Sequence, residues 1–301
     1  MSTLTVRPMT PDDDLASLNG GNGLAWQAVW WQELTATMDI RWFTGLVDGV
    51  PAGFAAVCPL PVAAGGYGGA VVNVVPTYRR RGLGTALRER LASEAHGLVP
   101  GLLASHVVPD GDSEAAVAAW GLPVLGRHVE SVLDLTALDR SAFTLASAGE
   151  GLVLSAELPD EDDETGWRAL HAFVEQRFGE SPDMAGGGGE LPYDTFRSMA
   201  AEPGNLLLAY LDDALVGVTL VTARPGEPLA RNTFFTGVAP QARGRGVATA
   251  LKSRHALMLS DRGVLRLLTQ NMEGNTPILA ANRRLGFRPT GAYVDVGLAL
   301  G

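Results

Sequence analysis

With 301 residues, 46% of them apolar, the chain is long enough for two domains with packed cores. Its net charge of −10 would repel a phosphate backbone, which argues against a nucleic-acid partner, and no apolar run is long enough to cross a membrane. One cysteine and five histidines without a ligand spacing indicate no metal site, and the start MSTLTVRPMTPDDD lacks a signal peptide. We therefore expect a cytoplasmic protein without metal, membrane or nucleic acid.

In chain order, an extended segment first meets an acidic turn at 3–14, and a stretch with helical spacing follows. Two apolar runs separated by Asp-Gly, at 43–57, predict an antiparallel hairpin. A strand that ends at Val74 then leads through a proline turn and the sequence RRRGLG into a helix. A further apolar strand at 101–108 and an alternating strand at 127–135 complete the half. This order predicts an α/β domain with a mixed sheet.

The second half repeats the first. VVPTYRRRGLGTAL at 74–87 and VAPQARGRGVATAL at 238–251 align at a distance of 164 positions, and the flanking segments recur in the same order. We therefore predict an α/β fold, with an α+β type of mixed sheet, made of two tandem domains at 1–140 and 150–301. Each domain should be a twisted mixed sheet flanked by helices.

Both copies place arginines and glycines where a strand passes into a helix. The first N–H groups of a helix have no partner inside it, and glycines without a Cβ would let an anion approach them closely. A P-loop would need GxxxxGK[ST] and a dinucleotide site would need GxGxxG, and neither copy has these patterns. The remaining pattern, [Q/R]xxGx[G/A] after a strand, is present as RRRGLG (79–84) and RGRGVA (243–248).

This pattern resembles the GCN5-related N-acetyltransferase (GNAT) family, in which the loop holds the pyrophosphate of acetyl-CoA. The resemblance implies acetyl-CoA as cofactor and a binding site in each half. In the second half it implies contacts from Thr236, Gly237, Val238, Arg243, Gly244, Arg245, Gly246, Val247, Ala248, Thr249, Asn271 and Asn275. In the first half it implies contacts from Val72, Asn73, Val74, Arg79, Arg80, Arg81, Gly82, Leu83, Gly84 and Thr85.

A second motif of the family is present in one half. TQNMEGNTPILAANRRLGF at 269–287 resembles it, with Asn275 at the position that binds the pantetheine arm. In the first half Asp110 takes the place of Asn275. We therefore expect the second half to be the catalyst, and the first half to have reduced or lost turnover.

Acyl transfer needs an oxyanion donor, a proton donor for the thiolate and a neutral amine. The resemblance implies the backbone N–H of Val238 as the oxyanion donor. Where many relatives have a tyrosine proton donor this chain has Asn282, which cannot release a proton, and Tyr293 is an alternative donor. His171 and Glu175, four residues apart on one helix face, are candidate bases, although a solvated pair would have the same spacing.

The resemblance implies an N-acetyltransferase that moves an acetyl group directly, in a ternary complex, to a primary amine of a small molecule. An antibiotic or a metabolite like a mycothiol precursor would fit. Two alternatives stay open: a protein or peptide N-acetyltransferase, and a non-catalytic acetyl-CoA-binding module. We expect a monomer or a homodimer.

Overall fold

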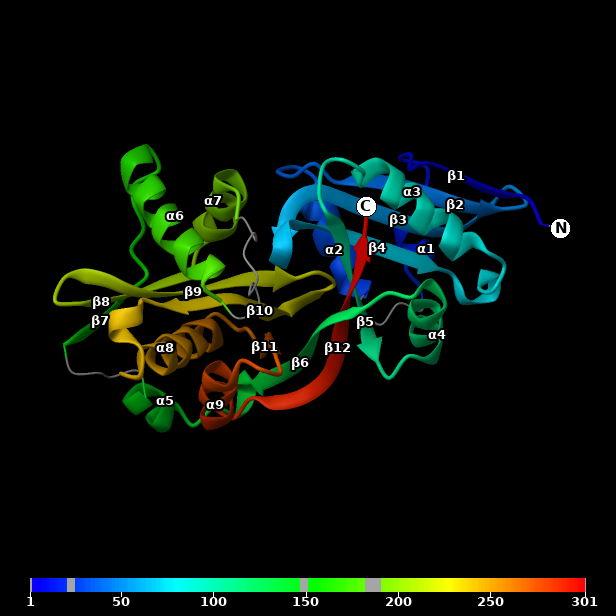
Figure 1. Ribbon diagram of the computed structural model, residues 1–301. Coiled ribbons are helices and arrows are strands. Elements are labelled where there is room, and N and C mark those ends of the chain that lie inside the picture. Colours follow the sequence, from blue (N-terminus) through cyan, green and yellow to red (C-terminus); the bar gives the residue numbers. More distant parts are fainter. Residues whose placement is uncertain (1, 21–24, 147–150, 182–190, 301) are drawn as a thin grey trace. The chain divides into compact units, whose positions relative to one another are not determined.

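The computed structural model describes residues 2–20, 25–146, 151–181 and 191–300, which form two compact units (Figure 1). The first unit contains the described residues up to Arg127 together with those from Ala292 onward, and the second contains the described residues from His128 to Gly291. Each unit has a mixed sheet with helices on both faces. The predicted fold class is therefore confirmed.

The sheet of the first unit has the order β1-β2-β3-β4-β5-β12. The β4–β5 pair is parallel and the neighbouring pairs are antiparallel. The strands are β1 (Leu4–Pro8), β2 (Arg41–Val47), β3 (Val50–Ala63), β4 (Tyr67–Val74), β5 (Gly101–Val108) and β12 (Arg288–Ala299). The helices are α1 (Leu15–Leu18), α2 (Ala25–Leu34), α3 (Leu83–Ala95) and α4 (Gly111–Trp120).

The second unit has the equivalent order β7-β8-β9-β10-β11-β6, again with one parallel pair, β10–β11. The strands are β7 (Leu152–Ser155), β8 (Leu206–Leu211), β9 (Ala214–Arg224), β10 (Glu227–Val238), β11 (Arg266–Met272) and β6 (Val124–Asp134). The helices are α5 (Arg140–Ala146), α6 (Glu164–Gly179), α7 (Tyr193–Ala201), α8 (Val247–Asp261) and α9 (Thr276–Arg284).

The last strand of each half of the sequence pairs with a strand of the other half. Residues 128–134 of β6, at the end of the first half of the sequence, pair with β11, and residues 292–299 of β12 pair with β5. Both strands are antiparallel to their new neighbour, as they would be in an unexchanged sheet. The compact units therefore divide the chain differently from the sequence repeat, whose boundaries at 1–140 and 150–301 stay a prediction.

Long central strands are buried on both faces. In β3, Ala55 and Val57 pack against α3, whereas Phe54, Ala56 and Cys58 pack on the opposite face with α1 and α2. Alternate residues of a strand point to opposite faces, so a strand between two helix layers is apolar throughout. β9 has the same role between α6, α7 and α8. This arrangement places the motif strands β4 and β10 next to the most deeply buried strand of each unit.

The motif helices cover one face of each sheet. α3 contacts the core through Leu83, Leu87, Leu91 and Ala95, which are four residues apart and so share one side. α8 is buried more completely, because α5 and α9 also pack on it. This burial encloses Lys252, which is 2% exposed and lies 5.1 Å from the ring centroid of Phe287. Within the described part of the chain its Nζ has no hydrogen-bond partner.

Lys252→Met should stabilise the protein. Burial lowers the pKa of Lys252 from 10.5 to about 7, so between these values the unfolded chain holds a proton that the folded chain lacks. The penalty is complete below pH 7 and disappears as the pH rises to 10.5. We expect the methionine variant to raise the free energy of unfolding by roughly 3–5 kcal/mol at pH 7, and by far less near pH 10.5, in urea titrations. If Lys252→Met and the unchanged protein were equally stable at pH 7, the lowered pKa of Lys252 would be contradicted.

Candidate functional site

Each motif strand reaches its helix by the same backbone path. A 3₁₀ turn, Pro76–Tyr78 or Pro240–Ala242, is followed by an extended arginine and then by Gly82 or Gly246, whose φ angles are 89° and 80°. None of the described side chains caps either helix. A Cβ on Gly246 would meet no described heavy atom within 4 Å. The first N–H groups of α8 are therefore accessible to an anion.

The loop arginines hold the backbone of their own loops. Arg79 donates from Nε to the carbonyl of Val74 at 3.0 Å, and Arg243 donates from Nε to the carbonyl of Val238, also at 3.0 Å. Each guanidinium also pairs with a carboxylate. The predicted contacts of these arginines with pyrophosphate stay a prediction. What the structure shows is that both brace the last residue of a motif strand.

The parallel strands of the second unit separate near the loop. Pairing of β10 with β11 ends at Thr233 and Thr269, five residues before Val238. The N–H of Ala239 bonds the carbonyl of Val216 on β9, at 2.8 Å. Because N–H groups alternate in direction along a strand, the N–H of Val238 points away from β9, toward the side of β11. It is thus available to a ligand between the two strands.

The first unit has the same geometry. Pairing of β4 with β5 ends at Gly69 and Leu103, and the N–H of Val75 bonds the carbonyl of Ala52 at 2.9 Å. The N–H of Val74 therefore also points into the space between the separated strands. Both halves thus combine a free strand-end amide with an uncapped helix start.

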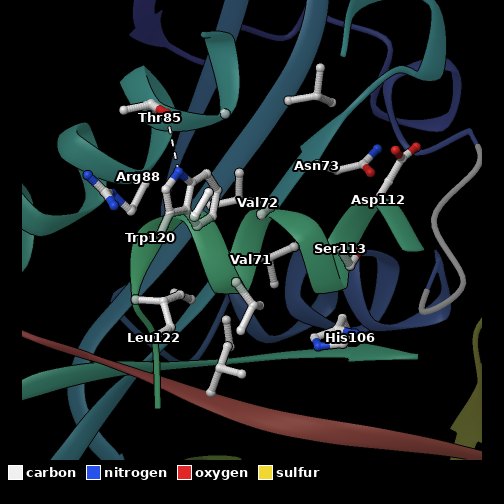
Figure 2. A pocket seen from close by; sticks show the side chains of 18 of the residues that line it. Val71, Val72, Asn73, Thr85, Arg88, His106, Asp112, Ser113, Trp120 and Leu122 are labelled. Atoms are coloured by element: carbon white, nitrogen blue, oxygen red, sulfur yellow. Dashed lines mark hydrogen bonds between the residues drawn. The ribbon is translucent and has the colours of Figure 1, made fainter. Parts of the chain in front are cut away.

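A cavity of about 420 Å³ lies in the first unit, between β4, β5, α3 and α4 (Figure 2). Trp120 on α4 lies beside Thr85, and Asp112 and Ser113, near the start of the same helix, also line the cavity. The predicted cofactor residues that line it are Val72, Asn73, Val74, Arg79, Arg80, Gly82, Gly84 and Thr85. Leu83 is instead buried in the core, so only its backbone can reach a ligand there, and Arg81 lies on the exposed rim.

Trp120 closes one end of this cavity. Its Nε1 donates to the Oγ1 of Thr85 at 3.2 Å, and the guanidinium of Arg88 lies 5.2 Å from the centre of its ring (Figure 2). Gly84 lies beside the ring, since a Cβ there would be in van der Waals contact with it at 3.4 Å. Sequence reasoning did not select Trp120 or Arg88. The repeat aligns Arg88 with Lys252 at the same distance of 164 positions, so both halves have a basic residue at this point of the motif helix.

In the second unit, the predicted residues of the second motif form a buried network. The Nδ2 of Asn282 donates to the Oδ1 of Asn271 at 2.8 Å, and Thr269 donates to the same oxygen at 3.3 Å. Asn282 is 2% exposed and its side chain points to β11. Asn275 is the N-cap of α9, as expected for the start of that helix. The motif thus links α9 to β11 through amide groups.

The other residues of the second-half loop lie where the motif predicts. Residues 243–246 form the loop, and Val247, Ala248 and Thr249 form the first turn of α8, with Val247 buried in the core. The hydroxyl of Thr236 hydrogen-bonds that of Thr219 at 3.0 Å. Backbone groups of this segment, rather than its apolar side chains, are therefore the atoms available to a ligand.

The candidate acid and bases lie in different places. Nε2 of His171 hydrogen-bonds the carbonyl of Leu191 at 2.6 Å, and its ring packs on Tyr193 and Phe196. Because a carbonyl can only accept, Nδ1 is the ring nitrogen with a lone pair. Glu175 is half-buried on α6. Tyr293 lies opposite Val107 in the first unit, because the exchange carries β12 into that sheet.

Gly237, next to Val238, is fixed by close packing. A Cβ at this position would lie 2.5 Å from the ring of Phe235 and 2.7 Å from the Cβ of Arg177. In the first unit the equivalent position is Asn73, whose amide donates to the carbonyl of Leu18 at 2.6 Å. The two motif strands therefore present different surfaces at the same point.

No helix in the described part of the chain is long and apolar enough to span a membrane. Among the residues with described positions, no group of three or more His, Cys, Asp and Glu side chains could hold a metal ion.

Gly237→Ala should destabilise the second unit. The new methyl group overlaps Phe235 and Arg177, and overpacking of this kind costs about 1–3 kcal/mol. Gly274→Ala is the matched control, since its Cβ would meet no described atom within 4 Å and its φ is not positive. Thermal unfolding should show a lower midpoint for the first variant than for the second. Equal midpoints would mean that Arg177 moves away freely.

Known proteins with the same sequence features and fold support an assignment. The sequence model of the Acetyltransferase (GNAT) family matches residues 16–120. A mycothiol acetyltransferase from Salinispora arenicola (strain CNS-205) is 34% identical over 257 residues, which cover 82% of this chain and 78% of the relative. One from Clavibacter michiganensis subsp. michiganensis (strain NCPPB 382) is 32% identical over 261 residues, covering 83% and 76%.

Solved structures agree on the fold along the whole chain. A tandem GNAT protein from the clavulanic acid biosynthesis pathway has a TM-score of 0.73 at 23% identity, covering 99% of both chains. A GCN5-related N-acetyltransferase from Sphaerobacter thermophilus has a TM-score of 0.72 at 20% identity, covering 99% of this chain and 96% of its own. With relatives more than 30% identical over most of their length, the chain belongs to the acetyltransferase (GNAT) family and is an acyltransferase that uses acetyl-CoA.

Proposed function

We propose that this enzyme transfers the acetyl group of acetyl-CoA to a primary amine of a small molecule, and that the second unit is the catalyst. The direction of the Val238 N–H, beside an uncapped α8, is the observation that carries the proposal. Acetyl-CoA supplies a thioester as acyl donor. The transfer makes one C–N bond, breaks one C–S bond and passes a proton from the amine to the departing sulfur.

The residues of the second unit fit this cofactor. The uncapped amides of α8 and the open space at Gly246 suit a diphosphate. The separated ends of β10 and β11 leave backbone groups for the amides of an extended arm, and Asn275 lies at the adjoining helix start. The N–H of Val238 is directed to donate to an acyl oxygen, which would stabilise the negative charge that develops there.

Differences between the units favour catalysis in the second. β10 has a bulge between Thr233 and Phe235, whereas β4 pairs with β3 in regular register from Gly69 to Val74. A bulge redirects the strand that follows it and is frequent beside active sites. In the first unit Asp110 replaces an asparagine, and a hydrogen bond from Ser113, with a smaller effect of the positive charge of Arg79, lowers the pKa of its carboxyl group. An ionised carboxylate at that position is unfavourable beside a thiolate.

The acceptor we propose is the amine precursor of mycothiol, that is, mycothiol without its acetyl group. The support is the name mycothiol acetyltransferase carried by the relatives from Salinispora arenicola and Clavibacter michiganensis subsp. michiganensis. His171, through Nδ1, and Glu175 stay the candidate bases for the amine, and both lie on α6. Asn282 is not suited to donate a proton, because an amide cannot release one at any useful pH.

Gly246→Asp should abolish acetyl transfer, because it places a carboxylate against the bound diphosphate. Gly82→Asp makes the same change at the equivalent position of the first unit, also at positive φ. Calorimetry with acetyl-CoA should show a lost or weakened site in each variant, and turnover should fall at least 100-fold only in Gly246→Asp. Turnover that survives in Gly246→Asp and fails in Gly82→Asp would move catalysis to the first unit.

An amine panel tests the acceptor. We expect deacetylated mycothiol to give a kcat/KM at least about 100-fold above glucosamine and above short peptides with free N-termini, because contacts beyond the amine add to transition-state binding. Release of the CoA thiol measures turnover. A peptide as the best acceptor would make the chain a peptide N-acetyltransferase. Acetyl-CoA binding without turnover on any amine would make it a binding module.

A further inference from the structure

Three charged residues form a bridge between α6 and the loop before α8. Glu180, at the end of α6, accepts from the guanidinium of Arg177 at 2.8 Å through Oε1. Its Oε2 accepts from Arg243 at 2.6 Å. One carboxylate thus connects a helix of the α6–α7 layer with the loop that leads into α8. We call this set of three residues the Glu180 bridge.

The two arginines of the bridge contact the backbone on either side of the Val238 N–H, the candidate oxyanion donor. Arg177 packs on Gly237, where a Cβ would lie 2.7 Å from its own Cβ. Arg243 holds the carbonyl of Val238 at 3.0 Å through Nε. Glu180 connects the two arginines, so Arg177 packs on Gly237, just before the Val238 N–H, and Arg243 holds the carbonyl of the next peptide, just after it. A reorientation of the backbone at Val238 is restrained from both sides.

One member of the bridge, Arg177, is buried. Arg177 is 6% exposed, and its guanidinium lies 5.5 Å from the ring centre of Phe173. A buried guanidinium without its carboxylate partner is strongly unfavourable, so Arg177 keeps Glu180 in place. Arg243 is half exposed and is positioned by the pair rather than by packing. Arg177 therefore positions Glu180, Glu180 positions Arg243, and Arg243 positions the backbone of Val238.

The first unit makes a different connection from the equivalent arginine. Arg79 holds the carbonyl of Val74 as Arg243 holds that of Val238, but its carboxylate partner is Asp112 on α4, at 2.7 Å. Asn73 occupies the position of Gly237 and bonds the backbone of Leu18 instead. Both units thus have a hydrogen bond from the loop arginine to the last carbonyl of the motif strand. In the second unit this arginine is also linked to α6, through Glu180.

We propose that Glu180 is a positioning residue for acyl transfer, which acts through Arg243 and Arg177 to aim the N–H of Val238 at the acyl oxygen. The proposal rests on the proposed function of the second unit. It assigns to Arg243 a role in catalysis that is separate from cofactor affinity. A small change in the direction of the Val238 N–H would lower the rate strongly, because a displacement of about 1 Å at a reacting centre can reduce a rate by about 100-fold.

Glu180→Gln is the first test, with acetyl-CoA and the best amine of the panel as substrates. We expect kcat to fall about 10- to 100-fold while the Kd for acetyl-CoA changes less than about 3-fold, and Glu180→Asp to recover part of the loss. Glu164→Gln is the matched control, because Glu164 on α6 also bridges two arginines, Arg168 on α6 at 2.6 Å and Arg197 on α7 at 2.8 Å. It should leave kcat unchanged.

Arg243→Gln provides a second variant that leaves the pair of Arg177 and Glu180 intact. It should reduce kcat like Glu180→Gln, and the double variant should be no worse than either single one, because both break the same bridge. Amide hydrogen exchange over residues 234–240 should be faster in both variants than in Glu164→Gln. This readout needs neither substrate nor turnover.

Several results would overturn the proposal. One is an unchanged kcat in folded Glu180→Gln. Another is a loss of acetyl-CoA affinity rather than of kcat in Arg243→Gln, which would make that arginine a pyrophosphate ligand. A third is unchanged exchange over 234–240 in both variants. If the unmodified chain binds no acetyl-CoA, the proposed function fails by itself, which the calorimetry shows before any variant is made.

Discussion

The chemistry proposed for this protein depends on a glycine in left-handed conformation directly before each motif helix. Gly82 and Gly246 turn the chain from strand to helix without any described side chain capping the helix start. The unpaired amides and the positive end of the helix dipole then favour an anion. Arg79 and Arg243 can stay near this end because a carboxylate and a backbone carbonyl accept hydrogen bonds from each guanidinium.

The repeated sequence forms two such helix starts, and the residues around them differ. The first unit surrounds its strand gap with Asp110, Asp112 and Trp120, and retains a cavity of about 420 Å³. The second has a bulged strand and buried amide groups, and its brace extends to α6 through Glu180. Arg80 illustrates the difference at the backbone: it adopts the positive φ that Gly244 adopts in the second unit, at a cost of about 1 kcal/mol. The same loop therefore has different surroundings in the two units.

The exchange of β6 and β12 explains which expectations depended on tertiary structure. Each strand pairs antiparallel at the equivalent place of a unit, β12 with β5 and β6 with β11. An exchange keeps the number and kind of ladder hydrogen bonds, so local sequence does not distinguish it from pairing within each half. It moves Tyr293 into the first unit, although in sequence it follows the second-unit motif.

Local sequence was sufficient for the features that depend on near neighbours: the strand–loop–helix motif, the glycine turns, the mixed sheet and the start of α9 at Asn275. Turn geometry and apolar periodicity depend on residues close together in the sequence, so the sequence alone is enough to predict them. The folded chain alone decided the strand exchange, the enclosure of Trp120 by Thr85 and Arg88, and the choice of Glu180 rather than another carboxylate for Arg243. These partners are tens of residues apart, and packing selects them from many residues of equal charge or shape.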